Sequence, residues 1–157
     1  MKINLKINGE LKELEVSPGD ILLEVLRREG YKGVKKGCMQ GECGACAVLI
    51  NGRPVNSCLV LAADVDGMEI TTIEGIGTPD KPHILQESFV DAGAVQCGYC
   101  TPGMIISAKA LLDKNPAPTE DEIKKALDGN YCRCTGYVKI IEAVKLAIKR
   151  MKKSKRK

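Results

Sequence analysis

The chain opens with alternating polar and apolar residues over positions 1–7, the pattern of a strand with one buried face. Asn8-Gly9 follows at once and is a strong signal for a two-residue hairpin turn. Leu14 and Val16 continue the alternation in the returning segment. The fold is therefore expected to begin with an antiparallel hairpin.

One helix is predicted after this hairpin. Ser17-Pro18-Gly19 indicates a turn and Asp20 is the expected N-cap. The apolar stripe that starts at Leu22 stops at Gly30. A loop rich in glycine and cysteine comes next, and an Asn-Gly turn then separates two short apolar segments. A small sheet is expected, with further strands at 47–50, 53–58 and 68–73.

The second half is predicted to be helical. Glycine and proline crowd into positions 74–82, which indicates a boundary, and beyond it apolar residues recur at helical spacing. Thr101 is expected to cap the second of four helices, with Pro102 as its first residue. Thr119 and Glu122 form a capping box for the third. The first and fourth helices carry apolar stripes at 84–89 and from Tyr137 to Met151.

The predicted fold class is α+β. A small sheet domain is expected over residues 1–75, a bundle of four short helices over residues 83–151 and a basic tail over residues 152–157. Lys149 to Lys157 contain seven of the 24 basic residues and no acidic one, so the net charge of +4 comes from this end. We expect the tail to be a solvated, frayed C-terminus, with a docking or nucleic-acid arm as the alternative.

Nucleic-acid binding, export and membrane insertion are not expected. One Phe, four Tyr and no Trp offer no aromatic platform for bases. The apolar runs are far shorter than the ~18 residues of a membrane span, and the alternating N-terminus lacks the apolar core of a signal peptide. We therefore expect a cytoplasmic protein. In a reducing compartment, cysteines are metal ligands or catalytic thiols more often than disulfides. We expect the same of the eight cysteines in this chain.

The first four cysteines have the spacing of an iron–sulfur site. Cys38, Cys43 and Cys46 form the C-x4-C-x2-C pattern of plant-type [2Fe-2S] ferredoxins, and Cys58 follows after eleven intervening residues. A cluster held by four thiolates is anionic and needs backbone N–H donors, for which three glycines in the loop leave room. A four-cysteine zinc site is the alternative, although zinc favours paired C-x2-C knuckles. Cys58 taken alone is also typical of a core residue.

The last four cysteines lie in the helical half. Cys97 and Cys100 form C-x2-C, and Cys132 and Cys134 form C-x-C, spacings that leave zinc and iron–sulfur both open. A thioredoxin-like pair fits poorly, because no strand precedes Cys97. Cys100 and Cys134 each stand just before a predicted helix, so two helix N-termini could direct their positive ends at one anionic cluster. This placement favours a cluster shared by two helical hairpins.

Residues for catalysis are few. His83 is the only histidine, so a Rieske centre, a histidine-ligated zinc enzyme, a Ser-His-Asp triad and a Cys-His pair all lack supporting residues. We expect His83 on the surface at a helix start. There is no P-loop, and Gly75-Ile76-Gly77 continues without the third glycine of a dinucleotide fingerprint. The chain is therefore expected to move electrons, with no catalytic residue and no substrate site of its own.

The cysteines sit in four longer motifs, GCMQGECGAC at 37–46, NSC at 56–58, QCGYCTPG at 96–103 and NYCRCTGY at 130–137. At these motifs the sequence resembles the small iron–sulfur subunit of the molybdenum hydroxylases, the family of xanthine dehydrogenases, aldehyde oxidoreductases and aerobic carbon monoxide dehydrogenases. The resemblance covers nearly the whole chain. Met39 and Gln40 vary the first cluster loop, and the basic tail is an addition.

The resemblance implies a ferredoxin-like β-grasp domain followed by a four-helix bundle, with a [2Fe-2S] cluster in each. It implies that all eight cysteines are ligands. It also implies a large partner subunit carrying molybdopterin with molybdenum, and a flavin subunit with FAD or another acceptor, in a heterotrimer or a dimer of heterotrimers. Electrons would pass from molybdenum through the helical-domain cluster to the ferredoxin-domain cluster and on to the flavin.

The same resemblance places Cys134 beside the pterin, with Gln96 as a candidate polar contact. For Gln96 the alternative is a hydrogen bond to a helix-end carbonyl. Two other functions compete with the electron-transfer subunit, namely a free-standing ferredoxin-like carrier and a zinc-stabilised interaction module. The substrate of the complex would be set by a pocket on another chain.

Overall fold

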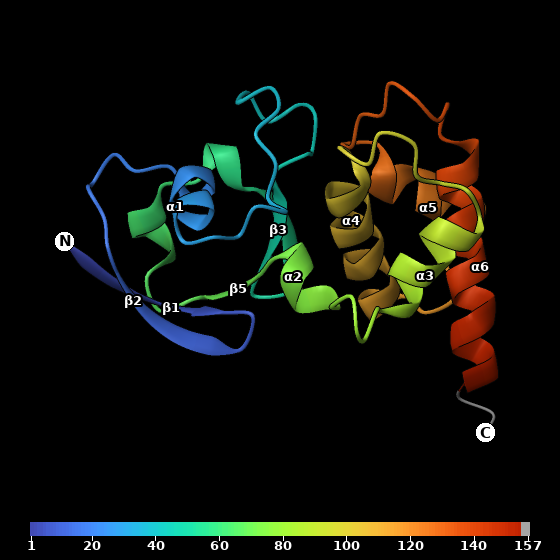
Figure 1. Ribbon diagram of the computed structural model, residues 1–157, viewed down its shortest axis with the longest axis horizontal. Coiled ribbons are helices and arrows are strands. Elements are labelled where there is room, and N and C mark those ends of the chain that lie inside the picture. Colours follow the sequence, from blue (N-terminus) through green and yellow to red (C-terminus); the bar gives the residue numbers. More distant parts are fainter. Residues whose placement is uncertain (155–157) are drawn as a thin grey trace.

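A five-stranded mixed sheet forms the first half of the molecule, and a helical half lies beside it (Figure 1). This computed structural model describes residues 1–154. The strands are β1 (Lys2–Ile7), β2 (Glu10–Glu15), β3 (Ala47–Ile50), β4 (Arg53–Asn56) and β5 (Glu69–Thr71). Their order in the sheet is β2-β1-β5-β3-β4, with β1 and β5 parallel and the other neighbours antiparallel.

The alternation at the N-terminus places one face of this sheet against a helix. Ile3, Leu5 and Ile7 of β1 are fully buried, whereas the polar residues between them are exposed. They pack in one apolar cluster with α1 (Leu22–Arg28). The Asn8-Gly9 turn has φ of 51° and 89°, as a type I′ hairpin requires. The predicted hairpin and helix are confirmed.

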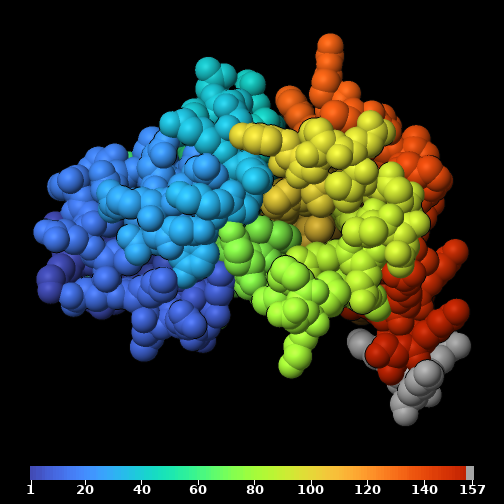
Figure 2. Space-filling model, in the orientation of Figure 1, coloured from blue at the N-terminus to red at the C-terminus, as the bar shows by residue number. Residues whose placement is uncertain are grey.

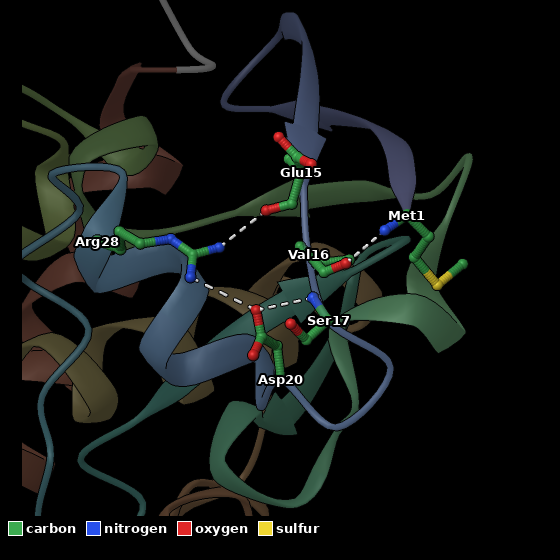
Figure 3. Close-up of polar contacts among 6 residues, drawn as sticks. All are labelled: Met1, Glu15, Val16, Ser17, Asp20 and Arg28. Atoms are coloured by element: carbon green, nitrogen blue, oxygen red, sulfur yellow. Dashed lines mark hydrogen bonds and ion pairs between the residues drawn. The ribbon is translucent and has the colours of Figure 1, made fainter.

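Polar contacts fasten α1 to the end of the hairpin (Figure 3). The Arg28 guanidinium donates to the Glu15 carbonyl at 3.1 Å and pairs with Asp20 at 3.4 Å. Asp20 also accepts from the Ser17 N–H at 3.1 Å. The prediction that Asp20 caps α1 is wrong, because its carboxylate closes the preceding turn and Ile21 stands at the N-cap without a side-chain hydrogen bond.

The chain after β3 departs from the predicted strands. β4 stops at Asn56, because the chain turns at Ser57, where the Val60 N–H donates to the Ser57 carbonyl at 3.4 Å. The Ser57 hydroxyl donates to the Cys46 carbonyl at 2.7 Å. β5 is likewise shorter than the predicted 68–73. The hydrophobic pattern does not predict the short helices in this region, which are 3-10 turns at Ser57–Leu59 and Ala62–Val65 and α2 (Ile73–Ile76).

Four helices build the second half, as predicted, and the α+β class is confirmed. Their apolar faces meet in a second core around Phe89, Met104 and Val144, all buried. Within residues 1–154, no helix has the length and apolar character needed to cross a membrane. The four are α3 (Ile84–Asp91), α4 (Thr101–Lys114), α5 (Glu120–Leu127) and α6 (Val138–Ser154).

Side chains satisfy the free N–H groups at the starts of α3 and α5. His83 is the N-cap of α3, and its Nδ1 accepts from the Leu85 N–H at 3.1 Å. Its predicted place at a helix start is confirmed, and the residue is half-buried. Thr119 and Glu122 form the predicted capping box, in which the Thr119 N–H donates to the Glu122 carboxylate at 2.7 Å and the Glu122 N–H donates back at 3.3 Å.

The predicted tail begins as helix. α6 continues through Ser154, so Lys152–Ser154 are exposed helical residues and the prediction of a frayed chain is wrong for them. Basic residues in a last helical turn interact favourably with the negative end of the helix dipole. Residues 155–157 of the predicted tail lie outside the described residues.

The two halves meet through an apolar contact and a close approach at a glycine. In Figure 2 the cyan part of the first half lies directly against the yellow part of the second. Ala47 and Leu49 of β3 pack against Ile106 and Ala110 of α4. Nearby, a Cβ on Gly103 of α4 would overlap a backbone carbonyl of the first half. α4 is therefore the element that positions the helical half against the sheet.

Replacing Thr119 by alanine removes the capping hydroxyl of α5. A lost cap costs about 1 kcal/mol, which corresponds to a melting temperature about 2–4 °C lower in a chain of this size. Differential scanning calorimetry of the full chain measures the shift. Thr119→Ser, which keeps the hydroxyl, should have the melting temperature of the wild type. An unchanged melting temperature in Thr119→Ala would show that this cap does not stabilise the fold.

Candidate metal centres

The cysteines lie in loops gathered at one end of the molecule. In Figure 1 the loop between α1 and β3, which carries the first three cysteines, lies at the top of the view with the α3–α4 and α5–α6 loops. Those two loops carry the C-x2-C and C-x-C motifs. Cys58 comes from the turn after β4 and is buried, as is Cys46. Segments far apart in the sequence thus bring all the thiols to one region.

The eight thiols come together two by two. The influence of one thiol on the pKa of its neighbour defines four pairs: Cys38 with Cys43, Cys46 with Cys58, Cys97 with Cys134, and Cys100 with Cys132. Among residues 1–154, no three His, Cys, Asp or Glu side chains are arranged to hold a single metal ion. A four-cysteine zinc site gathers its thiols around one ion, whereas a [2Fe-2S] cluster takes two thiolates on each iron. The pairs therefore fit one two-iron cluster in each half.

Backbone N–H groups surround the first site. Three of them donate to the Cys38 sulfur at 3.3–3.4 Å, those of Gln40, Glu42 and Cys43. The hydrogen bonds from Gln40 and Cys43 contribute most to lowering the pKa of the Cys38 thiol to about 6. The loop therefore stabilises negative charge on sulfur, which an anionic cluster requires.

The conformation of this loop depends on positions without side chains. A Cβ on Gly37 would lie 2.6 Å from the Cys43 sulfur, which is closer than real contacts allow. Gly41 has φ of 79°, and its carbonyl accepts from the Asn56 side chain at 2.7 Å. Met39 has φ of 59° although it carries a side chain, a strained conformation that its packing on the first core helps to hold.

Burial raises the pKa of other thiols, whereas the backbone hydrogen bonds lower that of Cys38. Burial is the main cause that raises the pKa of Cys46 to about 11 and that of Cys100 to about 12. For Cys132 burial also acts to raise the pKa, but hydrogen bonds from the Thr135 hydroxyl and N–H bring it below its usual value. Cys46 and Cys100 therefore hold protons at neutral pH, which they release when a metal binds.

The helix starts at the second site differ from the prediction. Cys100 itself is the N-cap of α4, and Thr101 is the first helical residue rather than the cap. α6 begins at Val138, so Cys134 does not stand directly before it. The turn 135–137 separates them because two of its residues have left-handed backbone conformations. The α4 N-terminus thus lies at the site, and α6 starts one turn away.

The two sites face a common hollow of about 260 Å³. The Tyr131 N–H donates to the Cys43 carbonyl at 2.9 Å, and the buried Asn130 side chain donates to the Gly44 carbonyl at 3.2 Å. Spacing along the chain does not predict these contacts, because they join residues more than 80 positions apart. The hollow is lined by Cys38, Cys43, Tyr99 and Tyr131 and by all four cysteines of the second half.

One edge of the second site is open. The Cys97 and Cys134 side chains are exposed, and so is Gln96 directly before them. Gln96 lies in the loop between the end of α3 at Asp91 and the start of α4 at Thr101. Its role as a polar contact stays a prediction.

Two family profiles match successive parts of the chain. Residues 5–71 match the family described as 2Fe-2S iron-sulfur cluster binding domain, and residues 72–145 match the [2Fe-2S] binding domain. The chain is 55% identical over 149 residues to the nicotinate dehydrogenase small FeS subunit of Eubacterium barkeri, covering 94% of this chain and 95% of that one. It is 46% identical over 144 residues to the xanthine dehydrogenase iron-sulfur-binding subunit of Escherichia coli O157:H7, covering 90% and 91%. The chain belongs to the small iron–sulfur subunits of the molybdenum hydroxylase family.

Solved structures share the fold of this iron–sulfur subunit. It superposes on the aldehyde oxidoreductase of Desulfovibrio gigas with a TM-score of 0.94 and 41% identity, over 98% of the subunit and 17% of that longer chain. Quinoline 2-oxidoreductase of Pseudomonas putida 86 matches with a TM-score of 0.92 and 42% identity, over 98% and 96%. The predicted combination of a ferredoxin-like and a helical domain is confirmed. The subunit serves iron–sulfur electron transfer in an oxidoreductase.

Gly37→Ala should empty the first site of the iron–sulfur subunit while sparing the second. The added methyl group displaces the Cys43 sulfur, so iron content should fall from about four atoms per chain toward two. Gly19→Ala is the matched control, because a Cβ at that position meets no atom within 4 Å. Full iron content in purified Gly37→Ala would show that the loop tolerates a side chain there.

Proposed function

We propose that this subunit carries electrons from a molybdopterin centre on a large partner subunit, through two [2Fe-2S] clusters, to FAD on a further subunit or to another acceptor. One observation carries the proposal: Cys38 and Cys43 of the first site line one hollow together with all four cysteines of the second, and the Tyr131 N–H donates to the Cys43 carbonyl across it. Residues 1–75 form the ferredoxin-like domain and residues 83–151 the helical domain in this assignment.

All eight cysteines are the proposed ligands. When bound, a cluster in each domain supplies a one-electron carrier. The pairing of the thiols supports two thiolates for each iron. The first-domain ligands are Cys38, Cys43, Cys46 and Cys58, and the helical-domain ligands are Cys97, Cys100, Cys132 and Cys134.

The polypeptide fixes the distance between the two sites. Cys43 belongs to one site and Cys132 to the other, and the Tyr131 N–H that reaches the Cys43 carbonyl precedes Cys132 by one residue. One hydrogen bond therefore joins the backbone of a proposed ligand in one domain to the residue next to a proposed ligand in the other. Electrons that move between the domains cross this contact without an intervening helix or strand.

A difference in exposure supports the direction of transfer. Cys97 and Cys134 are exposed, whereas Cys46 and Cys58 are only 3% and 5% exposed. We assign the exposed edge to the molybdopterin side, with Gln96 as a polar contact, because its amide offers both a donor and an acceptor. The ferredoxin-like domain then faces the acceptor.

Substrate oxidation is assigned to the partner subunits. Relatives 55% and 46% identical to this chain are named for nicotinate and for xanthine, two different substrates, which is expected if the substrate pocket lies on another chain. The proposed assembly is a cytoplasmic heterotrimer or a dimer of heterotrimers. Purification from the native source, with mass spectrometry of the co-purifying chains, tests it, and a chain that purifies alone with its clusters would instead be a free-standing carrier.

Cys43→Ser should remove one cluster and leave the other. The wild-type chain should contain about four iron atoms and, after reduction, give two distinct EPR signals. Cys43→Ser should lose only the ferredoxin-domain signal, and Cys134→Ser, the matched variant in the other domain, should lose only the helical-domain signal. Loss of both signals in either variant contradicts two independent sites, and zinc in place of iron would falsify the whole proposal.

Gln96→Ala should slow electron transfer from the molybdopterin centre to the helical-domain cluster. Loss of one polar contact corresponds to about a tenfold effect at most, so reduction of the helical-domain cluster by substrate should slow by up to that factor. Rapid-freeze EPR of the assembled complex measures the order and rate, and Glu10→Ala, at an exposed position of the N-terminal hairpin, is the control. If substrate reduces the ferredoxin-domain cluster first, the proposed order is wrong.

A further inference from the structure

A closed ring of hydrogen bonds lies beside the second site. The Thr135 hydroxyl donates to the Cys132 sulfur at 3.1 Å. The Tyr137 N–H donates to the Thr135 hydroxyl oxygen at 3.2 Å, and the Cys132 N–H donates to the Tyr137 phenol oxygen at 3.0 Å. Each of the three residues therefore holds the next in place.

This ring fixes the direction in which the Thr135 hydroxyl donates. A hydroxyl has one proton, and its oxygen already accepts from the Tyr137 N–H, so the proton is directed to the Cys132 sulfur. Tyr137 has φ of 69°, a left-handed conformation that is rare for a bulky residue and therefore strained. Such strain persists where the surrounding contacts over-determine it.

The first site is built differently. Its hydroxyl residue, Ser57, donates to the Cys46 carbonyl at 2.7 Å rather than to a sulfur. The Cys38 sulfur is contacted by backbone N–H groups, which would remain whatever side chain stood at those positions. The donor from Thr135 depends on the identity of one side chain.

We infer that Thr135 raises the reduction potential of the helical-domain site through its hydroxyl, whose oxygen accepts from the Tyr137 backbone N–H. The inference rests on the proposed function, because it takes Cys132 as a cluster ligand. Reduction adds one electron and therefore negative charge at the ligand sulfurs, and a hydrogen-bond donor stabilises the more negative state. The electron comes from an external reductant, and no covalent bond forms or breaks.

Thr135→Val tests the inference, since it removes the hydroxyl and keeps the shape of the side chain. In the full chain with both clusters, a dithionite titration followed by EPR gives the midpoint of each cluster separately. At the wild-type midpoint of the helical-domain cluster, the ratio of reduced to oxidised cluster should fall about threefold to tenfold in Thr135→Val. Thr135→Ser should keep the wild-type midpoint, and the ferredoxin-domain cluster should not shift in either variant.

Each outcome supports or overturns the inference. An unchanged midpoint in Thr135→Val, with both EPR signals present, overturns it and leaves the proposed function standing. A wild-type chain without iron overturns the proposed function itself. If Thr135→Val does not assemble its second cluster, Thr135→Ala decides, because it removes the same hydroxyl donor to the Cys132 sulfur with a smaller side chain. A lowered helical-domain midpoint in Thr135→Ala supports the inference, and an unchanged one overturns it.

Discussion

The Gly44 carbonyl oxygen of the first half packs directly against Gly103 of the second half. The distance between the two cysteine sites depends on this contact. The Gly44 carbonyl faces Gly103 of α4 so closely that a Cβ there would overlap it. It also accepts from Asn130, which is only 4% exposed. The neighbouring Cys43 carbonyl is bonded to Tyr131. Close packing transmits any displacement, so the distance between the sites is as rigid as this contact.

The two sites stabilise negative charge by different means. The first uses a loop whose backbone N–H groups converge on Cys38, which requires glycines and even a strained Met39. The second uses the start of α4 at Cys100 and a side-chain hydroxyl at Thr135. Outside its glycines, the loop keeps these backbone donors whatever side chain is present, whereas the Thr135 hydroxyl depends on one side chain. A substitution at Thr135 can therefore remove a donor to sulfur without altering the course of the backbone.

Local signals in the sequence predicted local structure well. The alternation of β1, the Asn8-Gly9 turn and the Thr119 capping box depend on neighbouring residues, and the structure contains them all. The division of the cysteines into a sheet half and a helical half was predictable for the same reason. What could not be predicted depends on residues far apart in the chain or on backbone conformation. α2 and the contact of Tyr131 with Cys43 are of the first kind, and the turn that delays α6 is of the second.

Each half has its own apolar core, which suggests that a half could be exchanged between relatives as an independent domain. The contact among Gly44, Gly103 and Asn130 argues otherwise. A chimaera that joined the first half of one relative to the second half of another would keep its geometry only if all three positions were compatible, since a single methyl group at either glycine meets an atom of the other half. The unit that can be transplanted intact is therefore the whole chain, although it folds around two cores.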